Sequence, residues 1–169
     1  MNTQYIKQRK STDCGIATLA NLLGTTYEDA HAMYGADRAT YGVTIQETAA
    51  ILFNEGYTTQ YIPFHGFNKA TGLSIQTIDP QILATSRTKA IIQVLTPAGI
   101  IHQVFFDGKN IHDPSPKVNG PQPLSAYDCF VDALFVVKEP AWLVRKCAGE
   151  VAEVVVTGKV GIKGEEVAL

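Results

Sequence analysis

The sequence predicts an α+β domain in which helices come first and an antiparallel sheet follows. Up to residue 56, three segments each combine an N-cap residue, apolar residues at helical spacing and a closing glycine. From residue 57 onward the pattern changes to short apolar runs separated by turn residues, which is typical of strands. Helices grouped before strands, rather than alternating with them, indicate the α+β class.

The expected helices begin at capping residues. The first lies in STDCGIATLANLLG, where Thr12 or Asp13 is the N-cap and Gly24 follows the last turn. The second lies in TTYEDAHAMYG and is capped by Thr26. The third lies in TIQETAAILFNEG, where Thr44 opens a capping box.

The remainder of the predicted fold is mostly strands. A turn joins KAIIQVL to IIHQVFF, and an Asp-Gly turn joins IIHQVFF to KNIHD, so we expect a meander of neighbouring antiparallel strands. The stretch PSPKVNGPQP is expected to be a loop. The expected strands are 57–64, 89–95, 100–106, 109–113 and 132–138, with a short helix at 79–87.

Composition narrows the function classes. A chain of 169 residues suits one domain, and a net charge of −2 without a basic face gives no support to nucleic-acid binding. No run approaches the roughly 20 apolar residues of a membrane span, and no secretory signal is visible, so we expect a cytoplasmic protein that does not bind membranes. Cys14, Cys129 and Cys147 are odd in number and form no C-x-x-C, which argues against a disulfide scaffold or a zinc site. We expect no cofactor.

Cys14 lies at the start of the first expected helix. Unpaired backbone N–H groups and the helix dipole favour a thiolate there. A thiol nucleophile also needs a base, a group that orients the base, and donors for the oxyanion. A histidine and a carboxylate that meet on neighbouring strands would supply the base and the group that orients it.

His102 and Asp113 meet that requirement in two of three plausible hairpin registers. With Asp107 and Gly108 as the turn, His102 lies directly opposite Asp113. With a turn at residues 108–109, His102 faces Ser115, and Asp113 is its diagonal neighbour on the same face. A three-residue loop would separate them. We also expect the helix of Cys14 to pack on the face of the sheet toward which His102 points, and a position of His102 on the opposite face would contradict the catalytic interpretation.

An isolated His–Asp pair is more often a core histidine satisfied by a carboxylate, but Cys14 favours the catalytic interpretation. Gln8 lies six residues before Cys14. A side-chain amide there can lie beside the backbone N–H of the thiol residue and complete a two-donor oxyanion hole. The other two cysteines and the other three histidines are expected to pack or to face solvent.

The segment QRKSTDCGIATLANLLG resembles the nucleophile motif of the bacteriocin-processing cysteine peptidases. In that motif a glutamine lies six positions before the cysteine, and the cysteine lies between an aspartate and a glycine. These papain-like domains trim double-glycine leader peptides, usually at the front of peptide-exporting ABC transporters. YGVTIQETAAILFNEGY, IIHQVFFDGKNIHDPSP and the stretch from LSAYDCF to LFVVKEP are similar to later blocks of that family, so the resemblance covers about residues 4–140.

The resemblance implies a papain-like fold and a catalytic set of four residues. Cys14 would be the nucleophile, His102 the general base and acid, Asp113 its orienter, and Gln8 an oxyanion donor. Asp13 would be a helix-start residue rather than a catalyst. The substrate would be a peptide or protein.

The domain division follows from the same match. Residues 1–140 would form the papain-like peptidase domain, and residues 141–169 a C-terminal extension of uncertain structure, with edge strands or a contact to another chain as its two expected roles. Hydrolysis of a peptide or isopeptide bond is the first interpretation. A non-catalytic peptide-binding or adaptor domain, and a thiol-dependent acyl transferase or deamidase, remain open, as does the oligomeric state.

Overall fold

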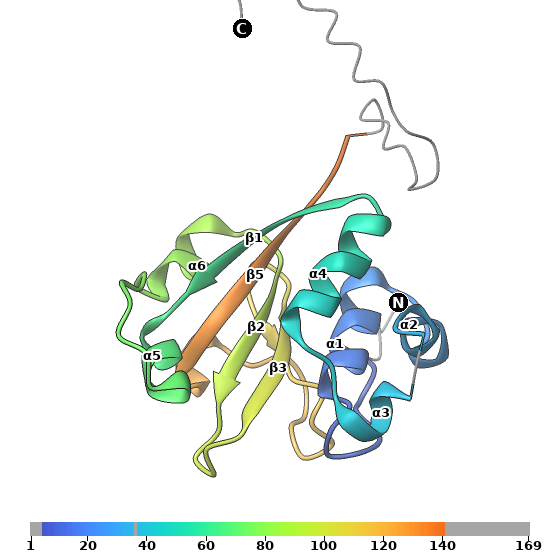
Figure 1. Cartoon of the computed structure of the whole chain (residues 1–169), viewed down its shortest axis with the longest axis horizontal. Coiled ribbons are helices and arrows are strands. Elements are labelled where there is room, and N and C mark those ends of the chain that lie inside the picture. The colour runs from blue at the N-terminus through green and yellow to red at the C-terminus, as the bar shows by residue number, and fades with distance from the viewer. Residues whose placement is uncertain (1–4, 36, 141–169) are drawn as a thin grey trace, which may run out of the picture.

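The computed structural model describes residues 5–35 and 37–140, so the expected extension at 141–169 lies outside the described residues. A five-stranded antiparallel sheet lies beside a group of N-terminal helices (Figure 1). The helices are α1 (Cys14–Leu23), α2 (Tyr27–Met33), α3 (Arg38–Tyr41), α4 (Ile45–Asn54), α5 (His65–Thr71), α6 (Gln81–Ser86) and the 3-10 helix η1 (Leu124–Ala126). The strands are β1 (Tyr57–Pro63), β2 (Ala90–Leu95), β3 (Ile101–Phe106), β4 (Ile111–His112) and β5 (Phe130–Lys138).

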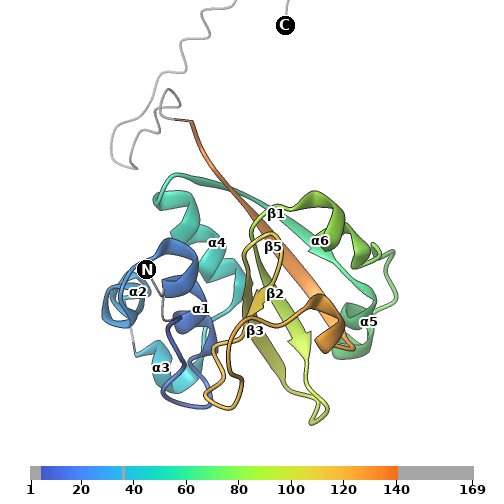
Figure 2. The same ribbon diagram turned by 180° about the vertical axis from the view of Figure 1, so that it is seen from behind.

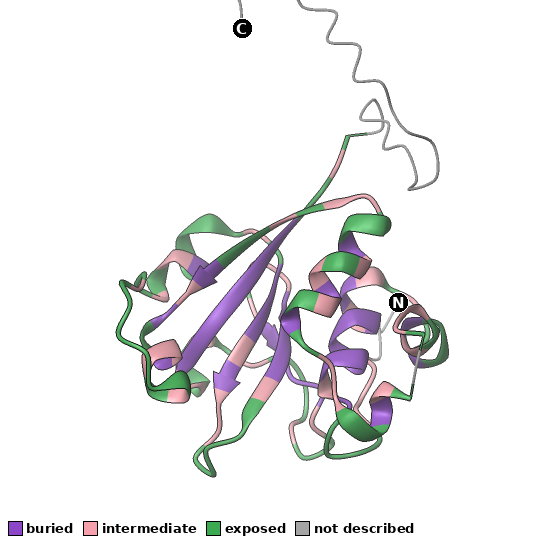
Figure 3. Ribbon diagram, viewed as in Figure 1, coloured by how far each residue is buried: buried purple, intermediate pink, exposed green. Residues whose placement is uncertain are grey.

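The strand order is β1-β5-β2-β3-β4. The expected meander of β2, β3 and β4 is confirmed, but the last strand of the sheet, β5, inserts between β1 and β2. Because β5 has a partner on each side, most of its length is buried (Figure 3). No local signal in the sequence specifies this insertion.

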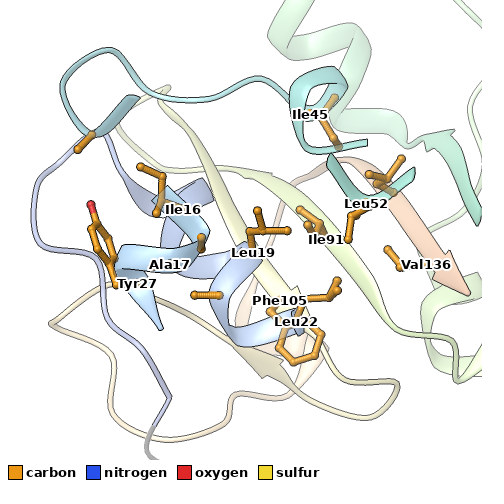
Figure 4. Packing of buried hydrophobic residues seen from close by; sticks show 14 residues of the cluster. Ile16, Ala17, Leu19, Leu22, Tyr27, Ile45, Leu52, Ile91, Phe105 and Val136 are labelled. Atoms are coloured by element: carbon orange, nitrogen blue, oxygen red, sulfur yellow. The ribbon is translucent and has the colours of Figure 1, made fainter. Parts of the chain in front are cut away.

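Side chains alternate between two faces of the sheet, and each face has its own apolar core. Ile91, Phe105 and Val136 project toward α1 and α4, where Leu19 and Leu52 cover them (Figure 4). The opposite face carries Ile92, Val104, Phe106 and Ala133, which pack with Leu83 of α6. Each core residue that leaves water contributes roughly 1.5–3 kcal/mol.

All three predicted helix starts are confirmed, and in two of them the side chain of the N-cap residue makes a capping hydrogen bond. The hydroxyls of Thr26 and Thr44 each accept a hydrogen bond from the backbone of the third residue of their helix, and Thr44 belongs to a complete capping box. Asp13 occupies the N-cap position of α1, but its side chain makes no capping hydrogen bond. Helices α3 and α5 were not predicted, since neither has a side-chain cap that marks its start.

The β3–β4 hairpin adopts the second of the two favourable registers. Phe106 pairs with Ile111 and Phe105 with His112, so the turn is centred on residues 108–109. Gly108 has φ +98° and lies against the backbone of Arg87, a position that a side chain could not occupy. This register makes Asp113 the diagonal neighbour of His102.

Candidate functional site

Cys14 is the first residue of α1, as the sequence predicts. The glycine that follows it allows the start of the helix to approach the sheet closely. A Cβ at Gly15 would lie 2.1 Å from Val43 Cγ2 and 2.7 Å from Gln103 Oε1, so a larger residue would push the helix away. Thr18, one turn later, donates a hydrogen bond to the carbonyl of Gln103 (3.0 Å). The thiol is thereby fixed relative to β3.

Asp13 holds the loop that precedes the thiol. Its fully buried carboxylate accepts hydrogen bonds from the backbone N–H groups of Arg9 and Lys10 (3.1–3.2 Å) and from the hydroxyl of Tyr27 (2.6 Å). Because this carboxylate is directed toward the loop, it does not occupy the N–H groups of the first turn of α1.

His102 and Asp113 form a close pair. Nε2 of His102 lies 2.8 Å from Oδ1 of Asp113. The carboxylate also accepts hydrogen bonds from the backbone N–H of Ser115 (2.7 Å) and the hydroxyl of Tyr127 (2.8 Å). Tyr127 was missed in the sequence, since nothing in LSAYDCF indicates that this ring folds back onto Asp113. With three donors the carboxylate has a fixed orientation.

The charge state of the pair follows from these contacts. Burial disfavours the imidazolium and lowers the pKa of His102, but hydrogen bonds to Asp113 and to Cys14 outweigh it and raise that pKa to about 9. Burial alone would raise the pKa of Asp113, yet its hydrogen bond with His102 holds the pKa below its usual range. At neutral pH the arrangement therefore favours an imidazolium between Asp113 and Cys14.

The expectation about the face of His102 is wrong. Cross-strand pairing places His102 with Val94 and Val104 on the face opposite the one that α1 covers. The pair with Cys14 still forms because β4 pairs only with Phe105 and Phe106, which leaves β3 without a neighbouring strand beside His102. At this open edge, the imidazole is within interaction distance of the end of α1.

The N-terminal segment lies against the loop that follows Asp113. Lys7 Nζ donates hydrogen bonds to the carbonyls of Asp113, Ser115 and Val118 (2.7–3.2 Å). The backbone N–H of Gln8 donates to the carbonyl of Pro114 (2.8 Å). Figure 2 shows the two loops side by side below α1. Gln8 and Asp113 are thus brought to one end of the sheet although 105 positions separate them.

The side-chain amide of Gln8 uses part of its hydrogen-bonding capacity within the protein. Its Nε2 donates to the carbonyl of Lys10 (2.8 Å), and its buried Oε1 has no hydrogen-bond partner within the described residues. An amide nitrogen carries two hydrogens, so one donor is used here and one remains.

A cleft of about 460 Å³ opens beside Cys14. Its walls come from the start of α1, the residues that lead into α4, the tip of the β2–β3 hairpin and α5. Tyr61, Gln93, Gln103 and Asp132 form the sheet side of the cleft. This hollow places open space next to the thiol, as a substrate would require.

The remaining candidates have packing or surface positions. The ring of His112 stacks on Tyr5 with 3.6 Å between centroids, and its Nε2 lies 2.6 Å from Oδ2 of Asp107. His65 is exposed and Cys129 is half-buried, whereas Cys147 lies outside the described residues. Within residues 5–35 and 37–140, no cluster of acidic, histidine or cysteine side chains could hold a metal ion, and no helix is long and apolar enough to cross a membrane.

Comparison with known proteins identifies structural neighbours only. Neither protein-family models nor curated proteins match the sequence. Among solved structures, the chain is similar to the peptidase domain of Streptococcus ComA, a bifunctional ABC transporter involved in a quorum-sensing pathway. That match has a TM-score of 0.55 and 16% identity, and covers 80% of this chain and 100% of the other. A double-glycine motif protease from an AMS/PCAT transporter, solved with its leader peptide, matches with a TM-score of 0.49 and 19% identity over 79% of this chain and 89% of the other.

The ComA match confirms the expected fold class. The chain has the mixed helix and antiparallel-sheet fold of that peptidase domain, which is the papain-like fold that the sequence resemblance implied. At 16% identity the likeness extends to the fold alone.

Proposed function

We propose that this protein is a cysteine peptidase that hydrolyses a peptide or isopeptide bond with Cys14 as nucleophile. The observation that carries this proposal is the position of His102, which lies 2.8 Å from Asp113 and also interacts with the thiol at the start of α1. A histidine that bridges a carboxylate and a helix-start thiol has the geometry of an activated nucleophile. The likeness of the fold to a peptidase domain supports the same reaction class.

We assign a residue to each step of the proposed reaction. The Cys14 thiolate attacks the carbonyl carbon, and the electron pair of the C=O bond moves to oxygen. When the oxyanion collapses, the C–N bond breaks, and the His102 imidazolium donates its proton to the leaving amine. His102, now neutral, takes a proton from water as the water attacks the thioester, and the acid product and the free thiol are released. Asp113 orients the imidazole throughout.

Two donors are proposed for the oxyanion. One is the backbone N–H of Cys14, since the Asp13 side chain leaves the first turn of α1 uncapped. The other is the amide of Gln8, whose second Nε2 hydrogen is not used by the bond to Lys10. The backbone N–H of Cys14 lies at the start of α1, where the helix dipole also favours negative charge.

Selective alkylation tests the nucleophile. With iodoacetamide near neutral pH, Cys14 should react much faster than Cys129 or Cys147, because the thiolate is the reactive form and His102 stabilises it. Peptide mapping by mass spectrometry gives the three rates from one sample. Equal rates at all three cysteines would contradict the proposal, and product masses from a peptide library would separate hydrolysis from acyl transfer or deamidation.

Replacing Gln8 tests the oxyanion hole separately. Gln8→Ala should lower kcat by about 10²–10³ through the loss of one donor. Alkylation of Cys14 should remain at the wild-type rate, because Gln8 has no part in forming the thiolate. Gln81→Ala, in an exposed glutamine at the start of α6 and outside the cleft, is the matched control and should change neither quantity. Full activity in Gln8→Ala would assign Gln8 a structural role.

A further inference from the structure

Asp132 is a carboxylate at the bottom of the cleft that holds Cys14. It lies on β5 with only 2% of its surface exposed. Among the described residues, no lysine, arginine or histidine makes a salt bridge with it, and none lines the cleft. Removing an unpaired carboxylate from water is costly, and burial raises the pKa of Asp132 to about 6, partly countered by the hydrogen bond from Tyr61. At neutral pH Asp132 therefore retains a negative charge that lowers the stability of the fold.

The neighbours of Asp132 supply hydrogen bonds but no positive charge. The hydroxyl of Tyr61 donates to Oδ2 (3.0 Å). With its amide oriented to suit its neighbours, Gln93 donates to both carboxylate oxygens (2.9 and 3.1 Å) and accepts from Gln103 Nε2 (3.3 Å). Oε1 of Gln103, itself buried, has no partner within the described residues. These side chains form a polar floor with one uncompensated charge and one unused acceptor.

The mouth of the cleft has the opposite character. Ile100 and Ile101 are exposed at the tip of the β2–β3 hairpin, and the half-buried side chains of Val43 and Phe67 lie on the same cleft. A ligand that suits both parts needs an aliphatic stem and a head that donates hydrogen bonds and carries positive charge. Among protein side chains, lysine and arginine have this combination.

We propose that the cleft is a specificity subsite in which Asp132 binds the cationic side chain of a lysine or arginine in the peptide substrate. The stem would pack between the apolar residues of the mouth, and the head would lie between the carboxylate and the unused Gln103 oxygen. This inference rests on the proposed peptidase function, because it places the reacting bond at Cys14. It also gives a role to a buried, destabilising carboxylate in the cleft that Cys14 lines.

Peptidyl acyloxymethyl ketones test the subsite without requiring a known cleavage site. Each inhibitor carries lysine or norleucine at one of the four residues before the reactive ketone and alanine at the others. Norleucine has the same stem without the ammonium group. At one position, lysine should accelerate alkylation of Cys14 at least tenfold over norleucine, and Asp132→Asn should bring this ratio close to one. Asp128→Asn, in an exposed carboxylate near the start of β5, should leave the ratio unchanged.

A pH series on the wild-type protein gives a second test that needs no variant. The lysine-to-norleucine ratio should fall as the pH decreases through about 6, because Asp132 then becomes neutral. Protonation of Cys14 and His102 affects the reaction with both inhibitors equally, so this contribution cancels in the ratio of the two rates. Of the side chains that contact Asp132, Tyr61 is the titratable one and stays neutral here, since burial and Asp132 raise its pKa; Gln93 does not titrate.

The outcomes are distinguishable. Equal rates for lysine and norleucine at all four positions, with Cys14 alkylated by both, would overturn the subsite and leave the peptidase proposal standing. Failure of every inhibitor to alkylate Cys14 would overturn the peptidase proposal and the subsite with it. A lysine preference that Asp132→Asn does not change, in a variant whose thermal unfolding remains cooperative, would also overturn the role of Asp132.

Discussion

Cys14→Ala should abolish peptide cleavage while the protein remains folded. The sulfur atom of Cys14 is the nucleophile that would form the thioester, so the substitution removes the first step of the reaction. The substitution removes one sulfur atom from a half-exposed position at the first turn of α1, so we expect the free energy of unfolding to change by less than about 1 kcal/mol. Cleavage of a peptide library followed by mass spectrometry gives the activity, and thermal unfolding by circular dichroism gives the stability.

Cys129→Ala is the matched control. It removes a second half-buried free thiol, which lies beside Gly66 of α5 and not beside His102. This variant should cleave at the wild-type rate. Residual cleavage in Cys14→Ala, or equal losses in both variants, would show that Cys14 is not the nucleophile.

Local signals in the sequence predicted the elements that carry the nucleophile and the base. Capping residues located the starts of α2 and α4, and Asp13, one of two N-cap candidates, located the start of α1 at Cys14. The hairpin turn limited His102 and Asp113 to a few registers, and the observed register is one of them. These features depend on residues that are close in the chain, which is why they can be read from it.

Contacts between distant segments could not be predicted in the same way. The insertion of β5, the bond from Gln8 to Pro114 and the hydrogen bond from Tyr127 to Asp113 all join segments whose approach is set by packing of the whole domain. The face of His102 was mispredicted because β4 is so short that β3 has an open edge.

One signal in the sequence was left unused. Gln93, Gln103 and Asp132 are polar residues within largely apolar strands. A polar residue within such a run must find partners when it is buried. The three strands align these residues side by side, which gives the polar floor of the cleft. Their common purpose is visible only once the strand order is known.

His102→Ala should reduce cleavage nearly as much as the loss of Cys14, by at least 10²–10⁴. Without the imidazole, the thiolate loses its stabilising partner and the leaving amine receives no proton. Alkylation of Cys14 by iodoacetamide should therefore slow as well, which separates this variant from Gln8→Ala. His65→Ala, which removes an exposed histidine at the start of α5, should change neither quantity.

The dependence of cleavage on pH tests whether His102 is the group that donates the proton to the leaving amine. The pKa of His102 is about 9, above the value of about 6.5 expected in the unfolded chain. The protonated imidazole therefore stabilises the fold fully below about pH 6.5, and this contribution is lost as the pH rises through about 9. Cleavage by the wild-type protein should fall over the same alkaline range, because the proton for the leaving amine disappears. An alkaline decline that persists unchanged in the residual activity of His102→Ala would assign the proton to another group and remove His102 from the mechanism.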